Sequence, residues 1–320
     1  MPRTIQLLMF SLILGSIVSA TDSREAGSRS SATRAAVPPT NIDHPQTAFR
    51  FSRIDFPDAT ATNPGGINAR GDIAGNYHDS AGNVHGFLLR QGNFSTIDFP
   101  DASFTSARGI NARGDIVGRI LGAGGDEHGF LLRDGTFTKI DFPGASATTA
   151  RGVNDAGDIT GRHFDSEGRE SGFILKDGKF FNVHISASCS TDVWMAMNNG
   201  RVLVGDVCTT ADNGIHGYVQ RQPGKSQAID FPGASAPCTA VRWINERGDM
   251  VGVYANTFDD CDNFQTHGFL LQNGEYTAID FPGAIITGVF GINDDGVMVG
   301  QYTDKNGNDH GFKALPNNSD

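Results

Sequence analysis

Three arginines occupy the same place in a recurring motif, and their chemistry is that of anion binding. Arg108, Arg151 and Arg242 each precede a Gly-Ile-Asn tripeptide or its variant. A guanidinium group binds a carboxylate or sulfate through two parallel hydrogen bonds, which suits an acidic sugar. If the strands that carry these arginines line a common channel, the three side chains converge on one site. The alternative is that each arginine forms a structural ion pair with one of the many aspartates.

A histidine recurs in the tripeptide His-Gly-Phe and is a second candidate for chemistry. It is found in five copies, at His85, His128, His216, His267 and His310. Histidine titrates near neutral pH and binds metals, but one imidazole in each unit of a ring would lie far from the next. We therefore expect a structural hydrogen bond within each unit, to the aspartate of an Ile-Asp-Phe-Pro box. The box aspartates are Asp55, Asp98, Asp141, Asp230 and Asp280. In the fourth copy His184 replaces the box aspartate although His216 is kept, which argues against strict coupling.

Copies four and five depart most from the pattern and carry the remaining candidates. Trp194 and Trp243 are either aromatic anchors for a ligand, since tryptophan is enriched at binding hot spots, or core residues between repeats. Asp259 and Asp260 belong to an acidic segment, 256–263, that offers oxygen ligands for calcium. Its spacing matches no calcium loop, so we expect a solvated loop. Segment 304–309 also resembles a calcium loop, but its glycine comes too early for the EF-hand pattern, so we expect a turn. We expect no cofactor or metal ion, with calcium as the alternative.

These residues are distributed over six near-copies of a segment of about 43 residues. Four landmarks recur in order: the Ile-Asp-Phe-Pro box, Gly-Ile-Asn, Gly-Asp-Ile-x-Gly and His-Gly-Phe. Each landmark lies in a short β-prone run, so each copy contributes four strands. Turns of the Asn-x-x-Gly and Asp-Gly kind join the second strand to the third and the fourth to the next box strand, because Asn, Asp and Gly tolerate positive φ. The asparagine of Gly-Ile-Asn is expected to cap its turn through backbone N–H groups. The other two connections are long.

Strands that alternate in direction place both long loops on one face and both tight turns on the other. We call these the long-loop face and the tight-turn face. Four antiparallel strands repeated six times predict a six-bladed β-propeller, with an open β-solenoid as the alternative. We expect the blade boundary in a long loop and a last blade built from both termini, which removes free sheet edges. Loops on a rigid scaffold commonly carry function, so the long-loop face is the candidate working face. Arg108, Arg151 and Arg242 are expected at the long-loop end of their strands.

All four cysteines belong to copies four and five, and a secreted protein is expected to pair them. Cys189 and Cys238 follow the box strands of their copies, whereas Cys208 and Cys261 follow the third strands. Both members of each copy then lie on the long-loop face. Of the three possible pairings we predict Cys189–Cys208 and Cys238–Cys261, each contributing about 3 kcal/mol. Zinc binding is the alternative, but the Cys-x-x-Cys spacing is absent from the sequence.

The ordered set Gly-Ile-Asn, Gly-Asp-Ile-Val-Gly and His-Gly-Phe-Leu-Leu resembles the bacterial HAF family of extracellular repeat proteins. The resemblance covers about residues 47–315. The chain has His-Gly-Phe where the family commonly has His-Ala-Phe. The resemblance implies an extracellular or envelope-associated repeat protein, and it supplies no catalytic residue.

The beginning of the chain predicts a secretory signal. Arg3 precedes an apolar run from Ile5 to Val18, and Val18-Ser19-Ala20 has the small-x-small cleavage pattern. The run is shorter than the roughly 20 residues that a spanning helix needs. The expected domains are a signal peptide at 1–20, a disordered leader at 21–46, the propeller at 47–316 and a tail at 317–320. A net charge of −11 disfavours nucleic acid and anionic membranes as partners.

We therefore expect a secreted, periplasmic or envelope-bound monomer without membrane insertion. It would bind a glycan, peptide or protein on the long-loop face and catalyse no reaction. The alternative is an extracellular polysaccharide hydrolase or lyase whose arginines hold an acidic sugar at the channel mouth. In that case Asp259, Asp260 or His184 would act as acid or base, and the catalytic residues are otherwise unknown. The two functions differ in whether the arginines share one pocket with a carboxylate.

Overall fold

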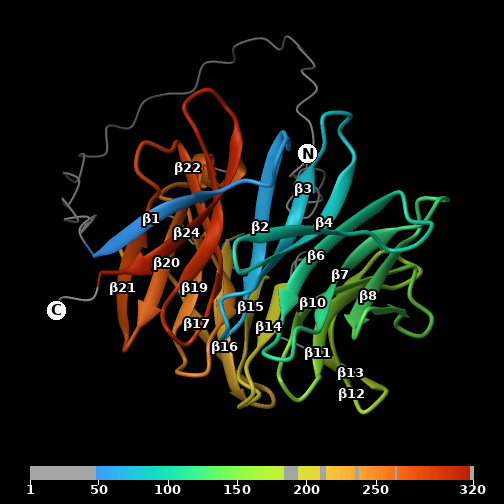
Figure 1. Ribbon diagram of the computed structural model, residues 1–320. Helices are drawn as coiled ribbons and strands as arrows, with labels where there is room; N and C mark the ends of the chain where they lie inside the picture. Colours follow the sequence, from blue (N-terminus) through green and yellow to red (C-terminus); the bar gives the residue numbers. More distant parts are fainter. Residues whose placement is uncertain (1–47, 184–193, 210–213, 235–237, 264, 318–320) are drawn as a thin grey trace, which may run out of the picture. The chain divides into compact units, whose positions relative to one another are not determined.

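The computed structural model describes residues 48–317, with the exception of 184–193, 210–213, 235–237 and 264 (Figure 1). The predicted signal peptide, most of the leader and the end of the tail lie outside these ranges and stay predictions. Within the described residues the chain forms 24 strands and one short helix. No helix in this part of the chain is long and apolar enough to cross a membrane.

The strands form six antiparallel four-stranded sheets that follow one another around a ring, which confirms the six-bladed β-propeller. The innermost strands of blades one to six are β2 (Ala61–Ile67), β6 (Phe104–Ile110), β10 (Ala147–Val153), β14 (Trp194–Met197), β18 (Thr239–Ile244) and β22 (Ile286–Ile292). The second strands are β3 (Ile73–His78), β7 (Ile116–Leu121), β11 (Ile159–Phe164), β15 (Leu203–Cys208), β19 (Met250–Tyr254) and β23 (Met298–Thr303). The third strands are β4 (Val84–Arg90), β8 (Glu127–Arg133), β12 (Glu170–Lys176), β16 (Ile215–Gln222), β20 (His267–Gln272) and β24 (Asp309–Pro316). The outermost strands are β5 (Asn93–Ile97), β9 (Thr136–Ile140), β13 (Lys179–Val183), β17 (Lys225–Ile229), β21 (Glu275–Ile279) and β1 (Phe49–Ile54).

The first and last strands of the propeller close the ring, as predicted. In Figure 1, β1 (blue) lies beside β24 (red), and the two pair antiparallel from Phe49 with Pro316 to Ile54 with Gly311. The crossing between blades is the long loop that follows the box, so the box strand is the outermost strand of a blade. The Gly-Ile-Asn strand that follows is the innermost strand of the next blade and lines the channel.

The tight turns have the backbone that their sequences predicted. The pairs Gln91-Gly92, Asp134-Gly135, Asp177-Gly178 and Asn273-Gly274 all have positive φ at both residues. This conformation gives a two-residue hairpin the same twist as its strands. In the fourth copy Arg201 adopts a φ of 59° where the other Asn-x-x-Gly turns place a glycine.

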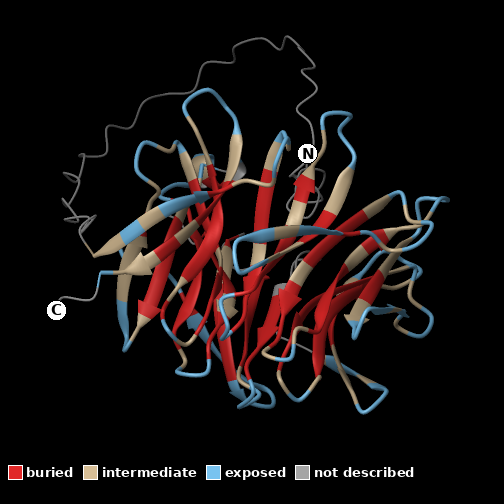
Figure 2. Cartoon of the chain, in the orientation of Figure 1, coloured by how far each residue is buried: buried red, intermediate tan, exposed pale blue. Residues whose placement is uncertain are grey.

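The hydrophobic core is divided among the seams between adjacent blades. Figure 2 shows buried inner strands with exposed residues at the loops and outer edges. In one seam Ala74 and Ile97 of blade one pack against Ile110, Ile116 and Phe130 of blade two. The box phenylalanine covers the end of such a seam, because the Phe56 ring stacks on Tyr77 with centroids 3.6 Å apart. A blade therefore buries its apolar surface only against its neighbours in the ring.

One expected loop is helical. Helix α1 (Phe258–Asp262) contains Asp259 and Asp260 and replaces the predicted solvated loop of blade five. The Thr257 side chain caps its first turn by accepting a hydrogen bond from the Asp260 N–H. This N-cap, with two carboxylates in the first turn, supplies the local reason for a helix here.

Candidate functional site

The three arginines singled out from the sequence lie on innermost strands of three blades. Arg108 is on β6, Arg151 on β10 and Arg242 on β18, and each is the extra residue of a β-bulge. The bulges place them three residues before the turn asparagine, in the second half of the strand, and the expected position at the long-loop end was wrong. A bulge re-aims the side chain of its extra residue. Arg151 and Arg242 are buried, and Arg108 is half-buried.

Two further arginines join this group, and the sequence analysis did not identify them. Arg119 on β7 and Arg162 on β11 occupy equivalent positions, opposite the glycine of the third-strand tripeptide. The other blades have different residues there, namely Asn76, Asp206, Val253 and Gln301. Their position directly follows the last glycine of the Gly-Asp-Ile-x-Gly run. The residue there differs between most copies, and this variation is the sequence signal that could have identified them.

Three carboxylates are paired with these arginines. Arg119 Nη1 donates to Glu127 Oε2 at 2.9 Å, and the Thr149 hydroxyl of blade three donates to the other oxygen of Glu127. Arg162 Nη1 donates to Glu170 Oε1 at 3.0 Å. Arg242 of blade five donates to Asp206 Oδ1 of blade four at 3.0 Å. The arginines thus reach carboxylates along the seams of blades two to five.

The five arginines lie near one another or near Glu127, and their charges influence the pKa values of Arg108 and Glu127. Burial lowers the pKa of Arg108 to about 9, and the nearby charges of Arg119, Arg162 and Arg242 contribute to the decrease. Burial alone would raise the pKa of Glu127, but Arg119, the Thr149 hydrogen bond, Arg162 and Arg151 outweigh it and lower this pKa. We call the five arginines with Glu127, Glu170 and Asp206 the arginine cluster. Its described residues carry five positive and three negative charges.

Blade one continues the polar lining with uncharged groups. Asn63 Nδ2 donates to Asn76 Oδ1, and Asn76 Nδ2 donates to Ser106 Oγ, both at 3.1 Å. Ser106 lies two residues before Arg108 on β6. Asn63 Oδ1 is buried and accepts no hydrogen bond from the described residues. An amide acceptor is therefore available beside the arginine cluster.

The tight-turn end of the channel is built from one repeated residue. The Nδ2 group of each Gly-Ile-Asn asparagine donates to the main-chain oxygen of its equivalent in the next blade, over 3.0 to 3.5 Å. The six residues are Asn68, Asn111, Asn154, Asn198, Asn245 and Asn293, and we call them the asparagine ring. Each Oδ1 also accepts the N–H four residues later, which confirms the predicted cap. The hydrogen bond from each asparagine to the next blade was not predicted.

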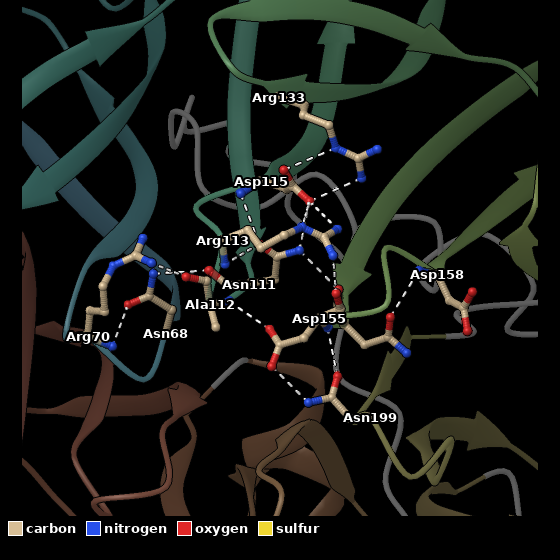
Figure 3. A network of polar contacts seen from close by, with 11 residues as sticks. Asn68, Arg70, Asn111, Ala112, Arg113, Asp115, Arg133, Asp155, Asp158 and Asn199 are labelled. Carbon is tan, nitrogen blue, oxygen red and sulfur yellow. Dashed lines mark hydrogen bonds and ion pairs between the residues drawn. The ribbon is translucent and has the colours of Figure 1, made fainter.

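Ion pairs and main-chain contacts surround the asparagine ring on the tight-turn face (Figure 3). Arg113 and Arg133 both contact Asp115, and Arg113 also donates to the main-chain oxygen of Asp155 in the next blade. Asn199 Oδ1 in turn accepts the Asp155 N–H at 2.7 Å. These contacts are structural and join neighbouring blades.

A hollow opens inside the asparagine ring on the tight-turn face, and its rim is acidic. Asp155, Glu246 and Asp294 line it together with Trp243 and the six asparagines. Burial raises the pKa of Glu246, and the charges of Asp294 and Asp155 raise it further. None of the five arginines lines this hollow. The two ends of the channel therefore differ in charge.

The two tryptophans do not form one anchor on the long-loop face. Trp243 lines the hollow and packs against apolar clusters of blades five and six, so it combines core packing with a channel position. Trp194 begins β14 in register with Asp206, and its side chain lies outside the described residues. Binding by either tryptophan stays a prediction.

The histidines pair with aspartates as predicted, and the pairing is stricter than the sequence suggested. Nδ1 lies 2.6 to 3.3 Å from a box carboxylate in the pairs His85–Asp98, His128–Asp141, His216–Asp230, His267–Asp280 and His310–Asp55. Each pair lies within one blade, so the box partner belongs to the next copy. Blade three has Ser171 in place of histidine, and the residue after its outermost strand is His184 in place of aspartate. The two losses fall in the same blade, and the argument against coupling was wrong.

Three of these histidines contact a second carboxylate. His85 Nε2 lies 3.5 Å from Asp79, His310 Nε2 lies 3.6 Å from Asp304, and His128 Nε2 contacts Asp126. Partial burial lowers the pKa of His128, but hydrogen bonds to Asp141 and Asp126 outweigh it and raise the pKa above its usual 6.5. Segment 304–309 is a turn, since Asp304 Oδ1 accepts the N–H groups of Asn306 and Asn308.

One predicted disulfide is present on the long-loop face of blade five. Cys238 and Cys261 are bonded, which fixes helix α1 to the crossover loop. The other predicted bond includes Cys189, which lies outside the described residues, so Cys189–Cys208 stays a prediction. Asp259 and Asp260 are carried by this helix between the second and third strands of blade five, whereas the arginines are on the first and second strands of their blades. His184, the other candidate acid or base, also lies outside the described residues.

Fold and ring closure define the class, a six-bladed β-propeller. No family model and no curated protein matches the chain. A TolB from Acinetobacter baumannii is similar in structure, with a TM-score of 0.52 and 12% identity over 77% of this chain and 64% of that one. A gluconolactonase from Xanthomonas campestris has a TM-score of 0.51 and 13% identity over 82% of this chain and 94% of that one. The Aleuria aurantia lectin in complex with Fucα1-6GlcNAc has a TM-score of 0.50 and 8% identity over 81% of this chain and 97% of that one. At these identities the likeness concerns the fold alone.

Proposed function

We propose that this protein is a secreted binding protein that holds an acidic sugar at the arginine cluster and does not turn it over. The observation that carries the proposal is that Arg108, Arg119, Arg162 and Arg242, from three blades, lie near one another, with Arg151 near Glu127, the ion-pair partner of Arg119. Guanidinium groups recognise carboxylate and sulfate with paired, charge-assisted hydrogen bonds. The predicted signal peptide and the resemblance to the HAF family support an extracellular location.

The charge of the cluster supports an anionic ligand. Five arginines and three carboxylates make up its described residues, within a chain of net charge −11. Arg108 remains protonated at neutral pH with a pKa of about 9, and burial and Arg119 are the main causes of its lowered value. A bound carboxylate would stabilise this half-buried positive charge.

The uncharged groups beside the cluster support a sugar as the carrier of the acid. Asn63 Oδ1 is a buried acceptor without a hydrogen bond from the described residues. A buried acceptor in that state costs about 1–3 kcal/mol, which a ligand hydroxyl would recover. A molecule with both hydroxyl groups and a carboxylate matches Asn63 and the arginines together.

The test is calorimetric titration of the secreted protein with a glucuronic acid disaccharide and with its neutral glucose counterpart. We expect binding of the acidic sugar alone. Arg151→Gln and Arg108→Gln each remove charge-assisted hydrogen bonds, so both should weaken binding by about 10- to 100-fold. The matched control is Arg247→Gln, because Arg247 pairs with Asp249 near the asparagine ring and should leave the affinity unchanged. Equal binding of both sugars, or full affinity in Arg151→Gln, would refute the proposal.

The alternative function is cleavage of the same sugar, and the same samples report on it. New reducing ends or unsaturated products would show turnover. Turnover that disappears in Arg151→Gln would replace the binding proposal with a hydrolase or lyase. Binding without product supports the proposal as stated.

A further inference from the structure

The channel narrows between the arginine cluster and the tight-turn face. Neighbouring innermost strands touch there through glycines. A Cβ at Gly109 would lie 2.7 Å from the Arg151 main-chain oxygen, and one at Gly291 would lie 3.1 Å from Gly66 Cα. Real Cβ atoms essentially never approach a backbone atom to 2.7 Å, so no room for a side chain exists between these strands.

Blade five replaces this glycine with the largest side chain. Trp243 is in register with Val251, as Gly109 is with Val117 and Gly291 is with Val299. Its half-buried indole lines the hollow and packs against the apolar clusters of blades five and six. The tryptophan therefore adds bulk to the channel at the narrowing.

The asparagine ring follows on the tight-turn side, and an acidic rim lies beyond it. Six hydrogen bonds join the ring without a break, from Asn68 to Asn111 and so on to Asn293 and back to Asn68. A group that passes through would have to fit within the hollow that these six bonds enclose. An anion would then meet Asp155, Glu246 and Asp294, whose negative charges repel it.

We infer that the ligand enters only from the long-loop side and ends at the arginine cluster, so that the protein recognises a terminal acidic residue of a glycan and rejects an internal one. This inference rests on the proposed function and adds the class of ligand. A terminal residue leaves its chain on the side from which it entered. An internal residue needs an exit for the chain on its far side, and the glycine narrowing, Trp243 and the asparagine ring occupy that path.

The experiment compares positional isomers. Three trisaccharides each carry one glucuronic acid, at the first, the middle or the last position, and a neutral trisaccharide serves as control. We expect at least one terminal isomer to bind the full-length secreted protein at least 10-fold more tightly than the internal isomer. Equal affinity of the internal isomer would overturn the inference and leave the proposed function intact. If no acidic isomer binds better than the neutral sugar, the proposed function itself fails and the inference with it.

A second measurement locates the end of the ligand. The chain has two tryptophans, so a Trp194→Phe variant reports Trp243 alone. Acrylamide quenching of Trp243 fluorescence should stay unchanged when the tightest-binding isomer saturates the protein, because the ligand stops above the narrowing. A twofold or larger decrease in the quenching constant would place the ligand at Trp243 and overturn the inference.

Discussion

The two ends of the channel are built from the two inner strands of the same six blades, and their residues vary to different degrees. At the tight-turn end every blade contributes one asparagine, and each amide bonds the next blade. Toward the long-loop end the equivalent second-strand residues are Asn76, Arg119, Arg162, Asp206, Val253 and Gln301. The first end is uniform, and the second differs from seam to seam.

The difference in sequence variation follows from the hydrogen bonds that the residues of each end make. The side chain of each asparagine in the ring donates to the next blade and also caps the turn of its own blade, so a change in one copy breaks contacts in two blades. The seam residues near the arginine cluster make contacts that differ from blade to blade, such as that of Asp206 with Arg242 and that of Asn76 with Ser106. Their identities are free to vary, and recognition of a ligand can use that freedom. Uniform positions in a repeat therefore identify the scaffold, and variable ones identify candidate binding residues.

The largest predicted effect is on the uniform end. Asn111→Ala removes a buried side chain that donates to Asn154 O and Asp115 and accepts from Arg113 N and Asp115 N. At about 1 kcal/mol for each hydrogen bond, the free energy of unfolding should fall by about 4 kcal/mol in urea titrations.

The control for this change is Asn93→Ala at the exposed start of β5, which should cost less than about 0.5 kcal/mol. Sugar affinity should be unaffected in both variants. A loss in Asn111→Ala no larger than in the control would contradict the structural role of the ring.

The second prediction concerns the covalent bond of blade five. The double change Cys238→Ser with Cys261→Ser opens a loop with a sequence separation of 23 residues. The chain-entropy model gives a loss of about 3 kcal/mol in the free energy of unfolding, measured by chemical denaturation. The bond lies in loops outside the arginine cluster, so affinity for the acidic sugar should not change. A parallel loss of affinity would show that the long-loop half of the site extends to helix α1.

The sequence was sufficient to predict the blade count, both kinds of tight turn and the closure by β1. These features depend on the short-range pattern of landmarks and glycines, which repeats about every 43 residues. The channel strand could not be predicted, because box and Gly-Ile-Asn strands are equally β-prone. Only the contact between innermost strands, seen at Gly109 and Gly152, distinguishes them.

Partners in the neighbouring copy were the main source of error. His216 bonds Asp230, which belongs to the next copy in sequence but to the same blade. The acceptor of Asn68 is the main chain of Asn111, one repeat away. Arg119 could not be predicted from the shared motifs, because its position differs between most copies. Helix α1 depends on the Thr257 cap and the Cys261 bond together, which no periodicity indicates.

A third prediction tests the narrowing where blade five differs from most of the others. Trp243→Gly restores the residue of blades one, two, three and six, so the repeat pattern alone predicts a neutral or stabilising change. Packing predicts the opposite, because the indole contacts the clusters of blades five and six. Full burial makes such a truncation cost about 3–5 kcal/mol, so we expect about 2 kcal/mol for this half-buried side chain, from thermal unfolding. An unchanged melting temperature would mean that the tryptophan serves the channel and not the seam.

The smallest effect is expected from pH. It distinguishes the stability contributed by the histidine–aspartate pairs of the long-loop face from that contributed by the asparagine ring. Hydrogen bonds to Asp141 and Asp126 raise the pKa of His128 despite partial burial and the nearby Lys139. For His267 the hydrogen bond to Asp280 is the largest cause of a raised pKa, with burial opposing it and the charges of Asp280 and Asp260 adding to it. A raised histidine pKa gives stability that is complete below about pH 6.5 and is lost as pH rises through the folded-state value.

The carboxylate of Asp79, which contacts His85, gives a pH dependence of stability with the opposite sign. Hydrogen bonds from Asn83 are the main cause that lowers the pKa of Asp79 to about 2 from its usual 3.8. The stability from Asp79 is therefore present above about pH 4 and is lost as pH falls toward 2. Together these groups place the stability maximum between about pH 4 and 6.5, and the melting temperature should fall from pH 6.5 to 8. In a His128→Gln, His267→Gln variant that fall should be smaller, whereas Asn111→Ala should keep the slope of the wild type at a lower melting temperature. The same slope in the histidine variant would show that the histidine–aspartate pairs do not contribute to the pH dependence of stability.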